Sequence, residues 1–422
     1  MRHLKSYLER VSNEDADNQE PVGVEPVSET VPEANDAVEA GTHVDEEPAA
    51  NVINAEIEEV SDIQESLENF NVLVDAAIAR GGMRPEEGVM FQASLEHFQR
   101  RLGVVQSKLG MEDFGGTMSR MKATTISQED LKETAIAAGK KIKELIMRLI
   151  ASVKETIAKI DTQGNKVKGI IENLKKNIRH IVGKDFVFEY ERGFTFTEGD
   201  LTPQGFNDLT KTIQEIIRMV EEFDTATKKT TVLANSLIKS SGDEPEVSAF
   251  DEELKVLWMG SNSPIAHFFG SAKSGMRKLG TLTTLNLVVG DDKDVVNRLG
   301  IALEKKNGDS LKLDVTKADF IRFVTAIEKI NNLCFDLTRA NANTLAALLD
   351  LGVMASEYGS KSPQAAMHIN TTSSKLSGSY DKIMEVTRRV SSIRNSLGYL
   401  LAQLALEFDK KATTGTDVAI TA

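Results

Sequence analysis

The sequence predicts a mainly α-helical protein that combines a long basic amphipathic helix and helical bundles with one small β-hairpin and a disordered acidic leader. Three observations predict this class. Residues 131–181 carry an apolar or small residue at almost every third or fourth position, and the composition is dominated by Leu, Ile, Ala, Lys and Glu. Residues 11–79 hold 19 Asp and Glu but no Lys or Arg. The net charge of −14 is therefore concentrated at the N-terminus.

The acidic leader is expected to span residues 1–60. Residues 11–55 are rich in Glu, Asp, Pro, Val and Ala without helical or strand periodicity. Such a segment cannot bury enough apolar surface to offset the entropy of ordering it, so we expect disorder. It is either a solubilising leader or a removable propeptide that masks a basic surface.

A helical hairpin with its linker is expected over residues 61–125. Apolar residues recur at helical spacing from Ile63, and Gly81-Gly82 is typical of a helix end. A second helix is expected to begin at Pro85 and to stop near Gly103. Residues 111–125 contain Gly and Met and are interpreted as a linker.

The next region, residues 126–240, contains the long helix. Its apolar seam, of the kind found in coiled coils, runs from 131 to 181 and would reach about 75 Å if straight. Gly164 interrupts the pattern at a cost of about 1 kcal/mol relative to Ala, which predicts one bent helix or two stacked ones. Residues 129–184 hold 13 Lys and Arg against 7 Asp and Glu, a net charge of +6.

Strands and further helices follow the long helix. Alternating aromatic residues at 185–190 and 194–197 flank a short turn and predict the β-hairpin, and residues 203–239 predict a helix. In the C-terminal region, 241–411, we expect short helices over 248–300, broken at 260–264, 270–275 and 290. A strand over 311–315, a helix over 317–357, a polar loop over 359–376 and a last helix over 379–411 follow, before a frayed tail at 412–422.

The sequence offers little catalytic chemistry. Gly270–Gly275 has the composition of a phosphate loop but not its G-x-x-x-x-G-K-[ST] order, and it is interpreted as a turn between helices. The histidines are scattered, and the single cysteine, Cys334, lies in an apolar pattern typical of a core residue. No run of 18 apolar residues predicts a membrane span. We therefore expect no enzymatic activity, no cofactor, no metal site and no membrane partner.

The basic side chains of the long helix mostly fall outside its apolar seam. They could contact nucleic-acid phosphates, pair with acidic residues of another subunit, or simply be solvated. Because the stretch has no aromatic residues and no base-reading motif, any DNA contact is expected to be non-specific. The candidate phosphate-contacting residues are Lys140, Lys141, Lys143, Arg148, Lys154, Lys159, Lys166, Lys168, Lys175, Lys176 and Arg179.

Two features together resemble a known family. One is the acidic leader, poor in lysine, ahead of a helical body, with Glu-terminated tripeptides in the leader. The other is the helix–Gly-Gly–helix segment that begins Leu67-Glu-Asn-Phe-Asn-Val-Leu-Val and continues through Arg84-Pro-Glu-Glu-Gly to Phe91-Gln-Ala-Ser-Leu. Both are similar to the internal head proteins, of the inner-body type, of phiKZ-like giant tailed bacteriophages. The similarity in sequence covers about residues 60–110, and the rest is similar in layout.

The resemblance implies a virion structural protein, made in the host cytoplasm and packed in the head interior with the genome. It implies other head proteins as partners, with packaged DNA and further copies of the chain as additional ones. In such phages a prohead protease trims internal proteins after small-x-Glu tripeptides. The corresponding residues here are Glu39, Glu68 and Glu25. Glu39 is preferred, because its segment is expected to be accessible and because Pro26 would hinder cleavage after Glu25.

Two other classes remain open from the sequence. The runner-up is a cytosolic helical adaptor or scaffold that binds a partner helix through residues 131–181. The third is an enzyme with an unfamiliar site. Loss of the acidic leader would move the net charge from −14 toward neutral or slightly basic, which is compatible with dense DNA.

Overall fold

A computed structural model gives the fold of the chain. It describes residues 72–103, 119–177, 186–190, 194–240, 244–259, 261–289 without 262 and 272, 299–306, 311–358 and 363–416, together with scattered residues between 59 and 70. The mainly α-helical class is confirmed. The expected disorder of the leader falls on residues outside the described part of the chain.

The helical hairpin predicted from the sequence is present. Residues 72–79 are helical, and the turn at Gly81 and Gly82 uses φ angles of 82° and 107°, which glycine adopts without strain. Helix α4 follows at Pro85–Arg101. The ring of Phe70 packs at 5.5 Å from that of Phe91 and at 5.7 Å from that of Phe98. The segment before the hairpin turn is therefore held on α4 by an aromatic cluster.

Helix α5 spans Arg120–Asn177 as one continuous helix. It begins well before the predicted 131, and the expected linker over 111–125 is wrong for residues 120–125, which are helical. The cause is a set of contacts with the hairpin that the local sequence does not reveal. The hydroxyl of Thr124 accepts from the backbone N–H of Met83 at 2.8 Å, and the amide of Gln99 donates to the hydroxyl of Thr134 at 2.7 Å.

Gly164 occupies a site where no side chain fits. A Cβ atom there would lie 2.7 Å from Nη1 of Arg394 and 2.8 Å from Cζ of Phe335. The helix continues through this position, so of the two alternatives predicted, two stacked helices is wrong and a single helix is present. Tertiary packing overrides the low helix propensity of glycine, because two other helices approach the backbone of α5 at this point.

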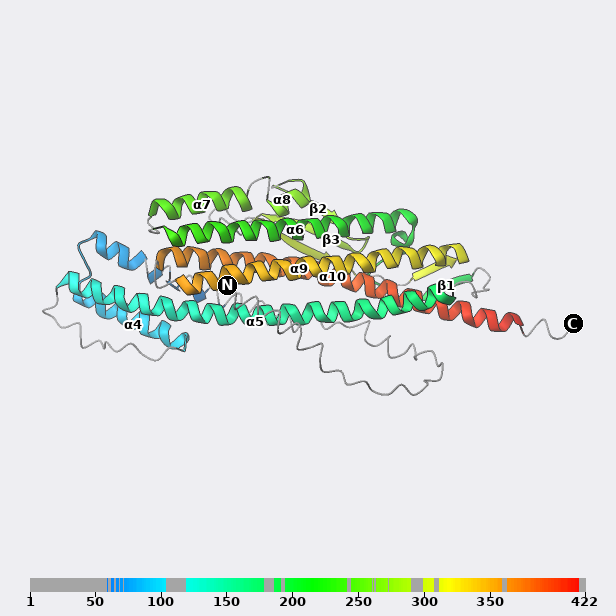
Figure 1. Cartoon of the computed structure of the whole chain (residues 1–422), viewed down its shortest axis with the longest axis horizontal. Coiled ribbons are helices and arrows are strands. Elements are labelled where there is room, and N and C mark those ends of the chain that lie inside the picture. The colour runs from blue at the N-terminus through cyan, green and yellow to red at the C-terminus, as the bar shows by residue number, and fades with distance from the viewer. Residues whose placement is uncertain are drawn as a thin grey trace. The chain divides into compact units, whose positions relative to one another are not determined.

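The central bundle joins α5 to three other long helices: α6 (Pro203–Lys239), α9 (Lys317–Tyr358) and α10 (Pro363–Thr416). Figure 1 shows them side by side, and α9 makes extensive contacts with α6, α10 and α5. The predicted helices over 203–239 and 317–357 are thus confirmed. The apolar faces of all four contribute to one continuous hydrophobic core.

Helix α10 corrects a prediction. Residues 363–376 were expected in a polar loop, but they form its first turns. Polar residues are accommodated there because their hydroxyls bond back to the helix, as in Thr372 to the carbonyl of His368 at 2.8 Å and Ser377 to that of Ser373 at 2.9 Å. The small side chains are buried, so this Ser- and Thr-rich stretch is a packing surface. Residues 359–362 and 417–422 lie outside the described part.

The predicted β-hairpin is wrong in its pairing. Strand β1 (Phe186–Tyr190) pairs antiparallel with β5 (Leu311–Val315), a strand that the sequence predicted, over 120 positions away. Phe194 and Phe196 do not form a strand. Their rings are buried and stacked at 4.9 Å, and Phe194 lies against Tyr399 of α10 at 6.3 Å. Burial of the aromatic rings against α10 replaces the local pairing.

Among the described residues of 248–300, helices occupy only the first part. Helices α7 (Glu244–Trp258) and α8 (Pro264–Phe269) agree with the prediction. Strands β2 (Met276–Lys278), β3 (Thr283–Val289) and β4 (Leu299–Lys305) then form an antiparallel sheet in the order β2-β3-β4. The β-branched residues of β3, with Thr283 and Leu285 buried, favour a strand over the helix that we expected. The described residues of 270–275 connect a helix to a strand, whereas a turn between two helices was predicted.

Candidate nucleic-acid interface

The candidate interface is the solvent-exposed side of α5. The opposite side of this helix carries the predicted apolar seam and is buried within the chain. Helices α9 and α10 both contact α5. The buried seam residues are Leu131, Ala138, Leu145, Val153, Ile160, Val167, Ile171 and Leu174. Because these positions are covered, they offer no surface to a partner helix or to a second copy.

The basic side chains follow the opposite side of the helix. With about 100° between successive residues, they spread over roughly 200° of the solvent-facing arc and do not form a narrow stripe. Lys141 and Lys143 are half-buried. The exposed residues are Lys140, Arg148, Lys154, Lys159, Lys166, Lys168, Lys175 and Lys176. Figure 1 shows the helix α5 that carries them.

Several of these cations are paired with carboxylates of the chain. Lys159 contacts Glu155 at 2.7 Å and Lys168 contacts Glu172 at 4.0 Å, both one turn away on α5. Lys175 donates to Oε2 of Glu328 on α9 at 2.6 Å. Such exposed pairs contribute only about 0–1 kcal/mol each, so a phosphate can replace the carboxylate at little cost.

In the C-terminal half of α5, three exposed lysines have no ion pair within the part of the chain that the structure describes. They are Lys154, Lys166 and Lys176. At 1.5 Å per residue they are spaced by about 18 Å and about 15 Å along the helix axis. These distances suit separate contacts with an extended polyanion better than one chelating site for a single phosphate.

The same surface also carries acidic residues. Glu129, Glu133 and Glu144 are exposed on the N-terminal half of α5, and Glu155 and Glu172 are exposed on its C-terminal half, so that each half has a net charge of +3. This distribution supports non-specific electrostatic contact and no base-specific readout. It agrees with the absence of aromatic residues between Arg120 and Asn177.

One ion pair joins the acidic N-terminal region to this surface. Oε1 of Glu59 lies 3.8 Å from Nζ of Lys141. Glu59 is the first residue that the structure describes, and it follows the acidic N-terminal part of the chain, residues 1–58.

 Counted over residues 1–58, that part holds 15 Asp and Glu against 3 Lys and Arg. The described chain thus begins, directly after this acidic segment, in contact with the basic helix.

Some predicted site residues fall outside the described part of the chain. Arg179 is one of them, and so are all three candidate cleavage residues, Glu25, Glu39 and Glu68. Two neighbours of the last site are described: Leu67 and Phe70 are both buried in the core.

Cys334 has the surroundings of a core residue, as the sequence predicts. Its side chain is buried in α9, and burial raises the pKa of its thiol to about 11. A thiol with this pKa is protonated at neutral pH and is a poor nucleophile. Among the described residues, no group of three or more His, Cys, Asp or Glu side chains is placed to hold a metal ion.

None of the described helices combines the length and the apolar character that crossing a bilayer requires.

Sequence reasoning missed two structural features. One is a buried polar cluster around Arg394, whose side chain is fully buried between α5, α9 and α10. The other is a groove between α6 and α7 with exposed Val232 and Val256 on its walls. An arginine at a helical core position could have signalled the first. The second has no clear sequence signal, because single exposed apolar residues are common.

Comparison with known proteins gives one match. Residues 33–240 match the family of phiKZ-like phage internal head proteins, which confirms the resemblance seen in the sequence. No curated protein and no solved structure matches the chain. The match places the protein inside the phage head and supports a structural role in the virion.

Proposed function

Residues 33–240 of this chain belong to the phiKZ-like phage internal head protein family, and we propose that the protein is a non-enzymatic structural component packaged with the genome. A prohead protease would first remove part of its acidic leader. The body would then pack among other head proteins and contact DNA through α5, without sequence preference.

The observation that carries this proposal is the division of α5 into two faces. Its apolar side is buried against α9 and α10, while most of its described basic side chains remain exposed. The whole helix, Arg120–Asn177, has a net charge of +6 from 13 Lys and Arg against 7 Asp and Glu. A folded core thus presents cations that the core does not need for its own stability. The phosphate backbone of a nucleic acid is the partner that such a surface attracts, because binding releases the counterions condensed on that backbone.

The leader opposes that attraction through its charge. Residues 1–39 hold 3 Lys and Arg against 10 Asp and Glu, net −7. Cleavage after Glu39 would leave 47 against 54, net −7, and cleavage after Glu68 would leave 47 against 45, net +2. Either cut reduces the repulsion between the protein and DNA, and the local charge of α5 then decides where contact occurs.

Among the candidate sites, Glu39 is preferred. Gly23-Val24-Glu25 is followed by Pro26, which hinders cleavage. Cleavage after Glu68 would separate Ile63 and Leu67, both buried, from the aromatic cluster of Phe70. A protease needs an extended segment, and cutting beside buried side chains would require local unfolding. We therefore propose residues 1–39 as the propeptide within the leader.

Duplex DNA of arbitrary sequence tests the contact. The protein extracted from mature heads should bind it with an affinity that falls steeply as salt increases, and the full-length chain should bind more weakly at the same salt. Binding that does not change with salt, or equal binding by both forms, would contradict the proposed role of α5 and of the leader.

A further inference from the structure

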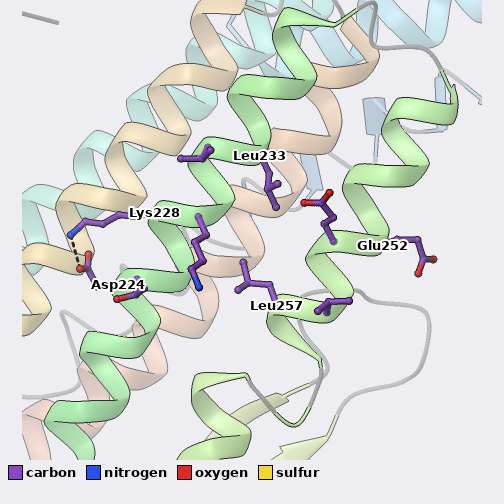
Figure 2. A pocket seen from close by; sticks show the side chains of 10 residues that line it. Asp224, Lys228, Leu233, Glu252 and Leu257 are labelled. Carbon is purple, nitrogen blue, oxygen red and sulfur yellow. Dashed lines mark hydrogen bonds and ion pairs between the residues drawn. The ribbon is translucent and has the colours of Figure 1, made fainter.

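A groove lies between α6 and α7. Its volume is about 880 Å³. Figure 2 shows Leu233 of α6 and Leu257 of α7 directed toward the space between the two helices. The two leucines are half-buried, whereas Val232 is 64% exposed and Val256 is 71% exposed. Large apolar side chains thus remain exposed to solvent along both helices.

The C-terminal end of α7 is joined to α6 through Trp258. Nε1 of Trp258 donates to the hydroxyl of Thr230 at 3.0 Å, and the Trp258 ring packs at 4.9 Å from that of Phe223. Toward Glu252 the two helices leave the hollow of Figure 2 between them. Exposed valines beside such a hollow cost free energy in water, which a partner would recover by covering them.

The charges on the two walls have opposite signs. Helix α6 contributes Lys228 and Lys229, and α7 contributes Glu252 and Glu253. Lys228 is paired with Asp224 at 2.6 Å, and Glu252 with Lys255 at 2.6 Å. Lys229 and Glu253 are exposed and have no ion pair within the described residues.

We propose that this groove is the interface of a homodimer, with a second copy of the same chain as its occupant. In a two-fold dimer every contact occurs twice, so one surface must supply both partners of each pair. The α6–α7 surface meets this condition. Lys229 of each copy faces Glu253 of the other, and the exposed Val256 of each copy enters the hollow lined by Leu233 and Leu257.

Sedimentation of the full-length chain over a range of concentrations tests the dimer. The expected result is a reversible monomer–dimer equilibrium. Val256→Asp should weaken the dimer by about tenfold or more, because it places a charge at the centre of the interface. Met90→Asp is the matched control, since Met90 is equally exposed on α4, at 73%, and lies outside the groove. Circular dichroism of each variant verifies that the fold is intact.

Charge reversal tests the identity of the occupant. Lys229→Glu and Glu253→Lys should each weaken the homodimer, and an equimolar mixture of the two variants should restore dimers, because the mixed pair again brings opposite charges together. A chain that stays monomeric, or a dimer insensitive to Val256→Asp and to both reversals, would overturn the proposal. Weakening without restoration in the mixture would also overturn it, since the groove would then serve a different partner.

Discussion

The guanidinium of Arg394 in α10 donates a hydrogen bond from Nη2 to the backbone carbonyl of Ile160 in α5 at 2.8 Å. The same nitrogen donates to the hydroxyl of Ser391 at 2.8 Å and to Oδ1 of Asn395 at 3.0 Å. Arg394 therefore links the two helices where Gly164 allows α5, α9 and α10 to approach closely. The basic face of α5 is held outward by this contact and by the apolar seam around it.

Gly164→Ala should lower the free energy of unfolding. The new methyl group gains helix propensity of about 1 kcal/mol, but it overlaps Phe335 and Arg394 and costs roughly 1–3 kcal/mol of overpacking. Gly169→Ala is the matched control on the same helix, because no atom lies within 4 Å of its added Cβ, and it should stabilise the protein. Urea unfolding compares the two, and equal effects would contradict the close approach at Gly164.

Arg394→Ala should destabilise the protein by roughly 2–5 kcal/mol, because it leaves a cavity and removes the link to Ile160. Arg339→Ala, on the neighbouring α9, removes a side chain that is 75% exposed and should change stability by no more than about 0.5 kcal/mol. Thermal unfolding measures both. A similar small effect for the two variants would mean that Arg394 does not join the helices.

The carboxylates of Asp381, which is buried, and Asp319, which caps a helix, should change the stability of the protein with pH in opposite directions. Burial raises the pKa of Asp381, despite Arg388 at 3.5 Å. The folded state then holds its proton at a pH where the unfolded chain has released it. Stability is therefore lost as the pH rises from the ordinary pKa of Asp toward the raised one. Asp381→Asn should remove this loss, so the variant gains relative to the wild type as the pH increases.

Asp319 should behave in the opposite way. The hydroxyl of Thr316, which donates to its carboxylate at 2.7 Å, lowers the pKa of Asp319. Its stabilising effect is present above the ordinary pKa of Asp and is lost as the pH falls through the lowered one. Asp319→Asn should therefore be costly at neutral pH and nearly harmless in acid. Unfolding midpoints across this range test both residues, and parallel pH profiles for the two variants would refute the assignment.

The DNA contact predicts a change in salt dependence. Replacing Lys154, Lys166 and Lys176 by Glu should weaken DNA binding and make the slope of log affinity against log salt shallower, by about 0.9 for each lost phosphate contact. Replacing Lys211, Lys239 and Lys278 by Glu changes the net charge equally at exposed positions outside α5. If both triple variants lose the same affinity, net charge and not the α5 surface controls binding.

The sequence predicted those features that follow from local periodicity. The seam of α5, the helices α6 and α9, the hairpin turn at Gly81-Gly82 and the β5 strand were all visible, because each depends on residues close together in the chain. The basic residues of α5 were also found, since charge and helical position are readable without a fold.

Features that depend on distant contacts were not predicted. Strand β1 pairs with β5, and only the folded chain brings them together. The start of α10 looked like a polar loop because its Ser and Thr side chains become compatible with a core only when their hydroxyls bond back to the helix. Gly164 looked like a helix breaker because Phe335 and Arg394, which occupy the space of its missing side chain, are far away in sequence.

The N-terminus of the protein in mature phage heads tests the central claim most directly. Mass spectrometry of the protein from purified particles should find a chain that begins at Ala40, after removal of residues 1–39, while infected cells that lack the active protease should contain the chain from Met1. An intact N-terminus inside mature heads would contradict the proposed removal of the acidic leader.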